Sequence, residues 1–415
     1  MDAGSAVDVA SSSEVYQAAV DGALGPDAAT LPGSGFAAQI CADLGDDEKA
    51  LLSPSELAAA AADFWGFARQ RTGDGPQVRL EELKAGAELQ ALEVVQDDRP
   101  FLVDSVMGEV AESGCVVRAM FHPVIEVPRD SEGRRKSGAP VRAESMILVL
   151  IEPVGHARGE ALVQGVLGTL GDVRQAVGDF AAMRALMTTT ADELERSAPA
   201  AVRGELDEDR AFLRWLADDR FVFLGARVYE YPRTIGGDYA PEEPRFNPMA
   251  CLGVLRDPTR SVLRRESEPA VLSTASRHDL GQEPLVVAKS NLRSRVHRRG
   301  YMDYIGVKRY AADGRASGEV RFIGLFTARA YEEPAGAVPL IRRKIEQVLA
   351  HAGLGHGSHN DKRLKNVLAT YPRDELFQMS AEDLLRISLG VVHLYDRPPQ
   401  AFARIAPAFF STAES

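Results

Sequence analysis

The chain contains few cysteines. Only Cys41, Cys115 and Cys251 occur among 415 residues. They are far apart, odd in number and show no CxxC spacing, so neither a disulfide framework nor a zinc site is indicated. This cysteine usage fits a reducing compartment, and we expect a cytoplasmic protein.

Long apolar runs and an excess of positive charge are also missing. No apolar stretch reaches the roughly 18 residues of a membrane-spanning helix, and the first residues lack the basic and apolar segments of a secretory signal. The formal net charge is −12. A general nucleic-acid binder needs a basic face, so this charge excludes that class and we expect neither a nucleic-acid nor a membrane partner.

Motifs for catalysis or cofactor binding are absent as well. The sequence has no P-loop, GxSxG or HExxH. The glycine-rich run 353–357 follows a helix rather than a strand, so it indicates a helix end and not a dinucleotide cradle. His351, His356 and His359, with Asp361, have irregular spacing and are typical of solvated loop residues. The sequence therefore predicts no catalytic, cofactor-binding or metal-binding residue.

The most informative segment that is present runs from Ala91 to Pro128. An apolar run ends at Asp97 and Asp98, and we expect the Asp98 carboxylate to cap the following helix, with Pro100 in its first turn. Gly114 ends this helix. Its apolar residues recur at three- and four-residue spacing and form one buried face, namely Leu102, Val103, Val106, Met107 and Val110.

The remaining periodicity predicts two α+β units. A second strand at 116–127, a buried third strand at 145–153 and a helical region at 160–197 complete a βαββαβ sandwich. In that helical region we expect Gly165, Gly168 and Gly171 to loosen the first half. Strands at 221–232, 284–291, 304–310 and 318–327 form a mostly antiparallel second unit, and helices follow at 338–351, 362–370 and 381–394.

These features divide the chain into six parts. We expect a poorly ordered tail at 1–35, a helical segment at 36–87, the βαββαβ sandwich at 88–197, an antiparallel α+β unit at 205–335, a helical motif at 336–397 and a divergent tail at 398–415.

Several long stretches resemble one known family. DDRPFLVDSVMGEVAESG (97–114), VRAMFHPVIEV (117–127), HRRGYMDYIGVKRY (297–310), GEVRFIGLFTARAY (318–331) and TYPRDELFQMSAEDLLRISLGVVHL (370–394) are similar to the N-terminal part of the large bacterial NAD-specific glutamate dehydrogenases. The resemblance covers most of residues 50–397. It implies an ACT-like module, a PAS-like module at 205–335 and helical connectors, while the dinucleotide fold and the catalytic residues lie further along a longer chain. NAD would then be a cofactor of the full-length enzyme and not of this segment.

The resemblance also places a candidate effector loop at Asp97, Asp98, Arg99 and Phe101. Sensor ACT domains usually carry glycine after the Asp-Arg-Pro turn, where a ligand approaches the backbone. Phe101 stands there in this chain, and we expect its ring to occupy the pocket. After Arg397 the sequence no longer resembles the family.

A basic run is the strongest hint in the second half of the chain. It consists of Lys289, Arg293, Arg295, Arg298 and Arg299. Guanidinium groups match carboxylate and phosphate geometry, so an anion site is one interpretation. An interdomain or intersubunit contact and a solvated face are the two others.

Three functions remain open at this point. The chain is either the regulatory and oligomerisation segment of a homo-oligomeric glutamate dehydrogenase, partnered by the rest of that enzyme and by an amino-acid effector, or a stand-alone sensor or scaffold left by truncation of such an enzyme. An independent enzyme is the third alternative. Whether the protein counts as an enzyme depends on polypeptide outside this segment.

Overall fold

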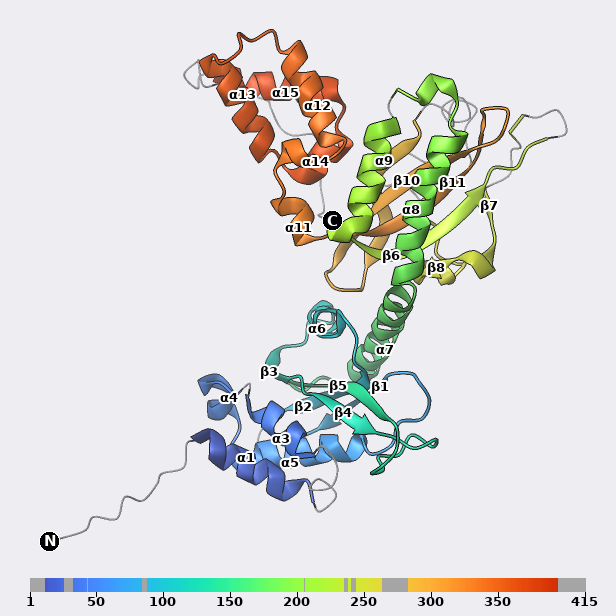
Figure 1. Ribbon diagram of the computed structural model, residues 1–415. Coiled ribbons are helices and arrows are strands. Elements are labelled where there is room, and N and C mark those ends of the chain that lie inside the picture. Colours follow the sequence, from blue (N-terminus) through green and yellow to red (C-terminus); the bar gives the residue numbers. More distant parts are fainter. Residues whose placement is uncertain are drawn as a thin grey trace. The chain divides into compact units, whose positions relative to one another are not determined.

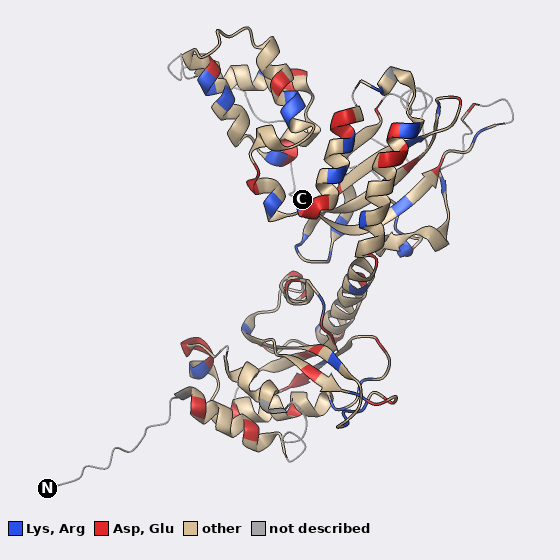
Figure 2. Cartoon of the chain, viewed as in Figure 1, with Lys and Arg blue, Asp and Glu red and all other residues tan. Residues whose placement is uncertain are grey.

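The computed structural model describes residues 12–25, 33–42, 44–83, 88–204, 206–234, 238–239, 244–262 and 283–394 (Figure 1). The predicted tail at 398–415 lies outside these residues. Two compact units are present: Met1–Phe180 with Leu252–Arg256 and Leu292–Tyr301 form the first, and the remaining segments form the second. Acidic and basic residues are interspersed in both units (Figure 2).

The first unit is built on a five-stranded antiparallel sheet. Its order is β1 (Gln77–Glu82), β2 (Gln90–Asp97), β5 (Val141–Ile151) and β3 (Val117–Phe121), and β4 (Val124–Pro128) also pairs with β5. Helices α6 (Leu102–Glu112) and α7 (His156–Gly178) lie on one face, and α1, α3 and α5 on the other (Figure 1). Because both faces are covered, Met146 to Ile151 of β5 are all fully buried. The predicted α+β class and ACT-like unit are confirmed.

The N-terminal helices form a core that includes part of the expected tail. Helix α1 (Ser12–Ala23) lies within the expected tail, yet Tyr16, Val20 and Leu24 are buried against α3 (Gly33–Ala42) and α5 (Pro54–Phe67). The Tyr16 hydroxyl donates to the Leu52 carbonyl at 2.6 Å, beyond the short helix α4 (Asp46–Leu51). The prediction of a disordered tail is therefore wrong for residues 12–25.

Three local predictions for the first unit also need correction. The strand expected at 116–127 is interrupted at His122 and Pro123, because proline has no N–H for a ladder, and the Pro123 carbonyl accepts from Met146 N at 2.9 Å instead. The long helix divides at Asp179 into α7 and α8 (Phe180–Ser197), not at its glycines. The sheet edge beside β2 is β1, which precedes the sandwich in sequence, rather than a strand that follows α7.

The second sheet is six-stranded, and most of its residues belong to the second unit. Its main path is β7 (Arg245–Phe246), β6 (Phe221–Glu230), β11 (Ala316–Phe326), β10 (Gly300–Tyr310) and β9 (Leu285–Ser294). A two-residue strand, β8, spans Leu252–Gly253. The pairs β6–β11, β10–β11 and β6–β7 are antiparallel, and a turn at 312–314 joins β10 to β11. An antiparallel sheet is confirmed, and the PAS-like comparison stays a prediction.

Helices complete the second unit. After α8 and α9 (Leu206–Trp215) come α11 (Ala328–Glu332), α12 (Ile341–His351), α13 (His359–Thr370), α14 (Arg373–Gln378) and α15 (Ala381–Leu394). Lys344 of α12 donates to the Leu376, Phe377 and Met379 carbonyls at 3.0, 2.7 and 2.8 Å. These carbonyls end α14, so the buried ammonium fixes α12 to it. Burial lowers the pKa of Lys344 to about 8. No helix among the described residues is long and apolar enough to cross a membrane.

Candidate functional site

The predicted effector loop joins β2 to α6 and is anchored by a buried ion network. The Asp97 carboxylate accepts from Arg71 at 2.7 Å, and the same guanidinium nitrogen reaches the fully buried Glu144 at 2.8 Å. Arg129 contacts both oxygens of Glu144, one of them at 2.7 Å. Asp97 is thus held in place by charge on the sheet, whereas Asp98 beside it is exposed.

Helix α6 begins differently from the prediction. Phe101 is its N-cap, with no side-chain cap, so Asp98 does not cap the helix and Pro100 precedes it. Phe101 has φ 71° and ψ 9°, the left-handed conformation in which glycine is most comfortable. The structure therefore gives a backbone reason for the glycine that sensor ACT domains place at this turn. The Phe101 ring packs on the imidazole of His297, with centroids 4.9 Å apart.

His297 fastens the segment 292–301 to the first turn of α6, within the first unit. Its backbone N–H donates to the Ser105 hydroxyl oxygen at 2.9 Å, and its Nδ1 lies 2.8 Å from an Asp104 carboxylate oxygen. His297 also has a positive φ, 64°. Two residues in left-handed conformations, Phe101 and His297, thus face each other at the start of this helix.

Two arginines of the basic run meet a single carboxylate on α6. Glu109 Oε2 accepts from Arg299 at 2.8 Å, from Arg295 at 3.3 Å and from the Thr169 hydroxyl of α7 at 2.7 Å. Burial acts to raise the pKa of Glu109, but the hydrogen bonds from Thr169 and Arg299 and the two arginine charges outweigh it and leave the pKa below its usual range. Glu112, one turn later, lies 3.2 Å from Arg299 and 3.8 Å from Arg293.

Glycines make room for this cluster. A Cβ placed on Gly165 would lie 2.3 Å from Glu109 Oε1, and one on Gly168 would lie 3.1 Å from Arg295. On α6, a Cβ on Gly108 would lie 2.8 Å from Arg299. We expected the glycines of α7 to loosen the helix, but α7 continues through them. Gly165 and Gly168 instead leave space for charged side chains, and nothing lies within 4 Å of a Cβ on Gly171.

The five cations of the basic run do not share one site. Lys289 belongs to the second unit, where its ammonium lies 2.6 Å from Asp303 and 3.1 Å from Asp374. Burial raises the pKa of the Asp303 carboxyl to about 6. Arg298 is exposed, whereas Arg293, Arg295 and Arg299 contact α6. Arg293 is exposed as well, although it lies near Glu112. The contacts with α6 lie within the first unit, and anion binding and an intersubunit contact stay predictions.

The glycine-rich run at 353–357 and the residues beside it, His351 and Asp361, make local contacts at helix ends. Gly353 and Gly357 have φ of 63° and 76°, and Asp361 accepts from Gly357 N at 2.8 Å at the start of α13. His351 Nδ1 lies 2.8 Å from the Gln347 carbonyl one turn earlier. Across the described ranges, no three His, Cys, Asp or Glu residues gather as metal ligands would.

Two family models match separate parts of the chain. Residues 36–166 match the ACT1 domain of glutamate dehydrogenase, and residues 338–397 match its helical motif 1. The chain matches the N-terminal region of the large NAD-specific glutamate dehydrogenases. The NAD-specific glutamate dehydrogenase of Halomonas elongata is 35% identical over 82% of this chain, and that of Pseudomonas aeruginosa is 31% identical over 87%. The Mycobacterium tuberculosis protein of the same name is 30% identical over 73%.

The chain spans about a fifth of these relatives, between 18% and 23% of their length. The ACT1 match begins at residue 36 and so includes α5 and β1, which we expected to precede the ACT-like unit at 88. The helical motif 1 match contains Lys344 and the three carbonyls that it binds.

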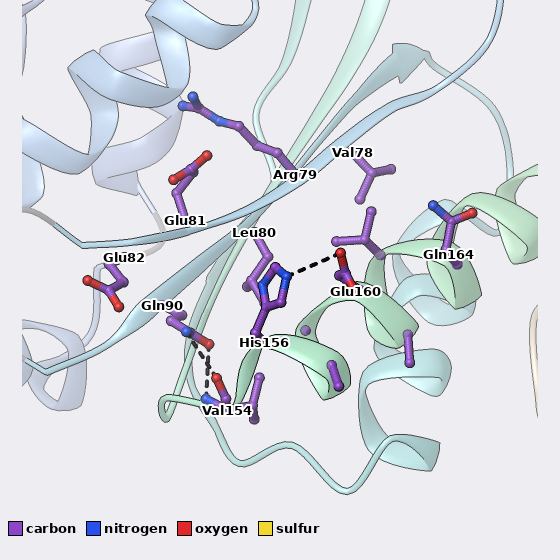
Figure 3. A pocket seen from close by; sticks show the side chains of 14 residues that line it. Val78, Arg79, Leu80, Glu81, Glu82, Gln90, Val154, His156, Glu160 and Gln164 are labelled. Carbon is purple, nitrogen blue, oxygen red and sulfur yellow. Dashed lines mark hydrogen bonds and ion pairs between the residues drawn. The ribbon is translucent and has the colours of Figure 1, made fainter.

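An open cleft in the ACT1 region was not predicted from the sequence. It has a volume of about 1120 Å³ and lies beside β1 and the first turns of α7 (Figure 3). Glu81 and Glu82 of β1 line it, as do His156 and Glu160 of α7, which lie 3.3 Å apart. Its signal in the sequence is weak, namely two successive glutamates, Glu81 and Glu82, after the apolar residues Val78 and Leu80.

Proposed function

We propose that this chain is a non-catalytic regulatory and assembly segment of a cytoplasmic, homo-oligomeric NAD-specific glutamate dehydrogenase. The complete enzyme would oxidise glutamate to 2-oxoglutarate and ammonia with NAD bound elsewhere in the polypeptide. The observation that carries the proposal is the ACT1 match over residues 36–166, combined with relatives of that name that are aligned along most of the chain.

The geometry of the effector loop supports a sensing role. Arg99 is about one-third exposed and Asp98 is exposed, while Asp97 is held by Arg71. An amino acid offers a carboxylate for the guanidinium and an ammonium for the Asp98 carboxylate. The loop is joined directly to α6, and the contacts of Phe101 and Glu109 with residues 292–301 give ligand binding a route to the segment that follows β9.

Ligand-dependent stability tests this role. A ligand that prefers the folded protein raises its melting temperature, so we expect aspartate, arginine or glutamate to raise the Tm of the purified chain. Arg99→Ala should abolish the shift, while Arg118→Ala, on the exposed surface of β3, should retain it. Absence of a shift with all three amino acids would remove the sensing role.

Glutamate-dependent NADH formation tests the non-catalytic assignment. We expect none from the purified chain at any protein concentration. Steady production of NADH that scales with the chain and survives removal of contaminating enzymes would refute the proposal.

A further inference from the structure

We propose that the free edge of β1 pairs with β1 of a second copy of this chain, around a two-fold axis through Leu80. This inference deepens the assembly part of the proposed function and rests on it. The feature that supports it is the terminal position of β1 in its sheet: among the strands the structure describes, β1 pairs with β2 alone. An edge strand presents N–H and C=O groups that can pair with another chain.

The sequence of β1 protects this edge by charge alone. Strand edges that stay free are commonly blunted by proline, by bulges, by extreme shortness or by charged side chains. The six residues of β1, QVRLEE, include neither proline nor glycine, and the register with β2 runs without a bulge from Gln77 to Glu82. Three of the six residues, Arg79, Glu81 and Glu82, are charged. A partner strand therefore has to match these charges.

The charge pattern selects one register. In an antiparallel sheet, residues directly opposite each other point their side chains to the same face, whereas successive residues of one strand point to opposite faces. Two copies of β1 can therefore pair only in registers in which one residue lies opposite itself, with the two-fold axis between the two copies of that residue. An axis through Arg79 would set two arginines against each other, and an axis through Glu81 would do the same with two carboxylates. An axis through Leu80 sets Arg79 of each copy opposite Glu81 of the other and pairs Leu80 with itself.

The surroundings of β1 have room for this pairing. Arg79 and Glu81 lie on the same side of the strand, and Leu80 contacts α7, where a Cβ on Gly159 would lie 2.9 Å from it (Figure 3). The cleft of about 1120 Å³ continues along Val78 and Leu80. It leaves space on the α7 side of the strand for the same side chains of the second copy. The resulting contact is isologous, as in most homodimers.

Charge reversal on each side of the pair gives a sharp test. Sedimentation velocity of the purified chain should show concentration-dependent dimers. Glu81→Arg sets two like-charged pairs across the axis and should weaken association roughly tenfold, because cross-strand charge pairs contribute at both symmetric positions. Arg79→Glu should do the same. An equimolar mixture of the two variants restores both opposite-charge pairs, so heterodimers should form more tightly than either variant associates with itself.

Matched controls separate this edge from others. Glu126→Arg makes the same change on exposed β4 of the same sheet and should leave association unchanged. Because Arg79 also binds the buried Glu93, circular dichroism must show that Arg79→Glu folds. If it does not fold, Leu80→Cys replaces it: oxidation should trap a disulfide dimer, and Val141→Cys, exposed at the start of β5, should not give one.

Each outcome bears on the inference. A chain that stays monomeric at all concentrations, or a mixture that does not associate, refutes β1 pairing. Dimers that persist in Glu81→Arg would refute this edge while leaving the proposed assembly role in place. A ligand-induced Tm shift without dimers would leave the sensing role standing alone.

Discussion

Replacing Glu144 by Gln probes the ion network under the effector loop. The carboxylate is fully buried between two guanidinium groups that are themselves almost completely buried, on Arg71 and Arg129. Glutamine keeps the shape but removes the charge, and its amide NH₂ would face an N–H donor of one arginine. Breaking one partner of a buried charge pair costs about 3–5 kcal/mol, so we expect a loss of that order in the unfolding free energy of the first unit.

Urea denaturation followed by tryptophan fluorescence measures this loss. The chain has two tryptophans, Trp65 in the first unit and Trp215 in the second, so a Trp215→Phe background reports the first unit alone. Arg135 stacks 3.5 Å above the Trp65 ring, which makes the fluorescence sensitive to the loop that carries Arg129.

An exposed carboxylate supplies the control for this measurement. Glu132 pairs with Arg134 at 2.8 Å, and both side chains are largely exposed. Glu132→Gln should cost no more than about 1 kcal/mol, as is usual for surface pairs. If Glu144→Gln costs as little as this control, the network does not anchor the loop and the reasoning fails.

Three further predictions concern backbone, helix and pH. Gly133→Ala should lower the urea midpoint of the first unit several times more than Gly138→Ala does. Both glycines have a positive φ, but only a Cβ on Gly133 would meet a backbone atom, because it would lie 1.7 Å from the Arg71 carbonyl oxygen. Glu109→Gln should speed amide hydrogen exchange in residues 292–301 more than Glu112→Gln does, because Glu109 accepts from both Arg295 and Arg299 and is the less exposed carboxylate; equal exchange in the two variants would contradict this. Because the folded pKa of Asp303 is raised from 3.8 to about 6, its contribution to stability is fully present below pH 3.8 and is lost as pH rises through about 6. The stability of the wild type relative to Asp303→Asn should therefore fall over that window, and a difference independent of pH would count against the assignment.

Local signals predicted several elements correctly. The spacing of Leu102, Val106 and Val110 defined the buried face of α6, and all three are buried. Ser53 and Glu56 form a capping box at α5, as the Ser-Pro-Ser-Glu sequence at 53–56 indicates, and Ala312–Gly314, a typical hairpin-turn sequence, joins two strands. Each of these features depends on neighbours within a few residues, which is the range that a periodic pattern or a cap describes.

Predictions that depended on distant contacts were less successful. Residues 1–35 are rich in Ala, Ser, Gly and Asp, which suggested a poorly ordered tail, but α1 forms because its apolar residues pack against α3 and α5. Gly165 and Gly168 were interpreted as weak points of a helix, since nothing in the local sequence shows that Glu109 and Arg295 approach them from other elements. The sequence grouped Lys289 with the four arginines of the basic run, but its partners are distant in sequence. Asp303 and Asp374 follow it by 14 and 85 residues.

The position of the edge strand β1 in the sequence determines where a fragment of the ACT1 domain has to begin. A fragment that starts at residue 88 would contain α6, α7 and four of the five strands, but it would lack Arg79, whose guanidinium contacts the buried Glu93 carboxylate on β2. Burial already raises the pKa of Glu93 to about 7 with that arginine present. Such a fragment would expose β2 as a new, mostly apolar edge with an uncompensated acid in its middle, which favours aggregation over folding. Excision of a functional domain therefore has to begin upstream of Gln77.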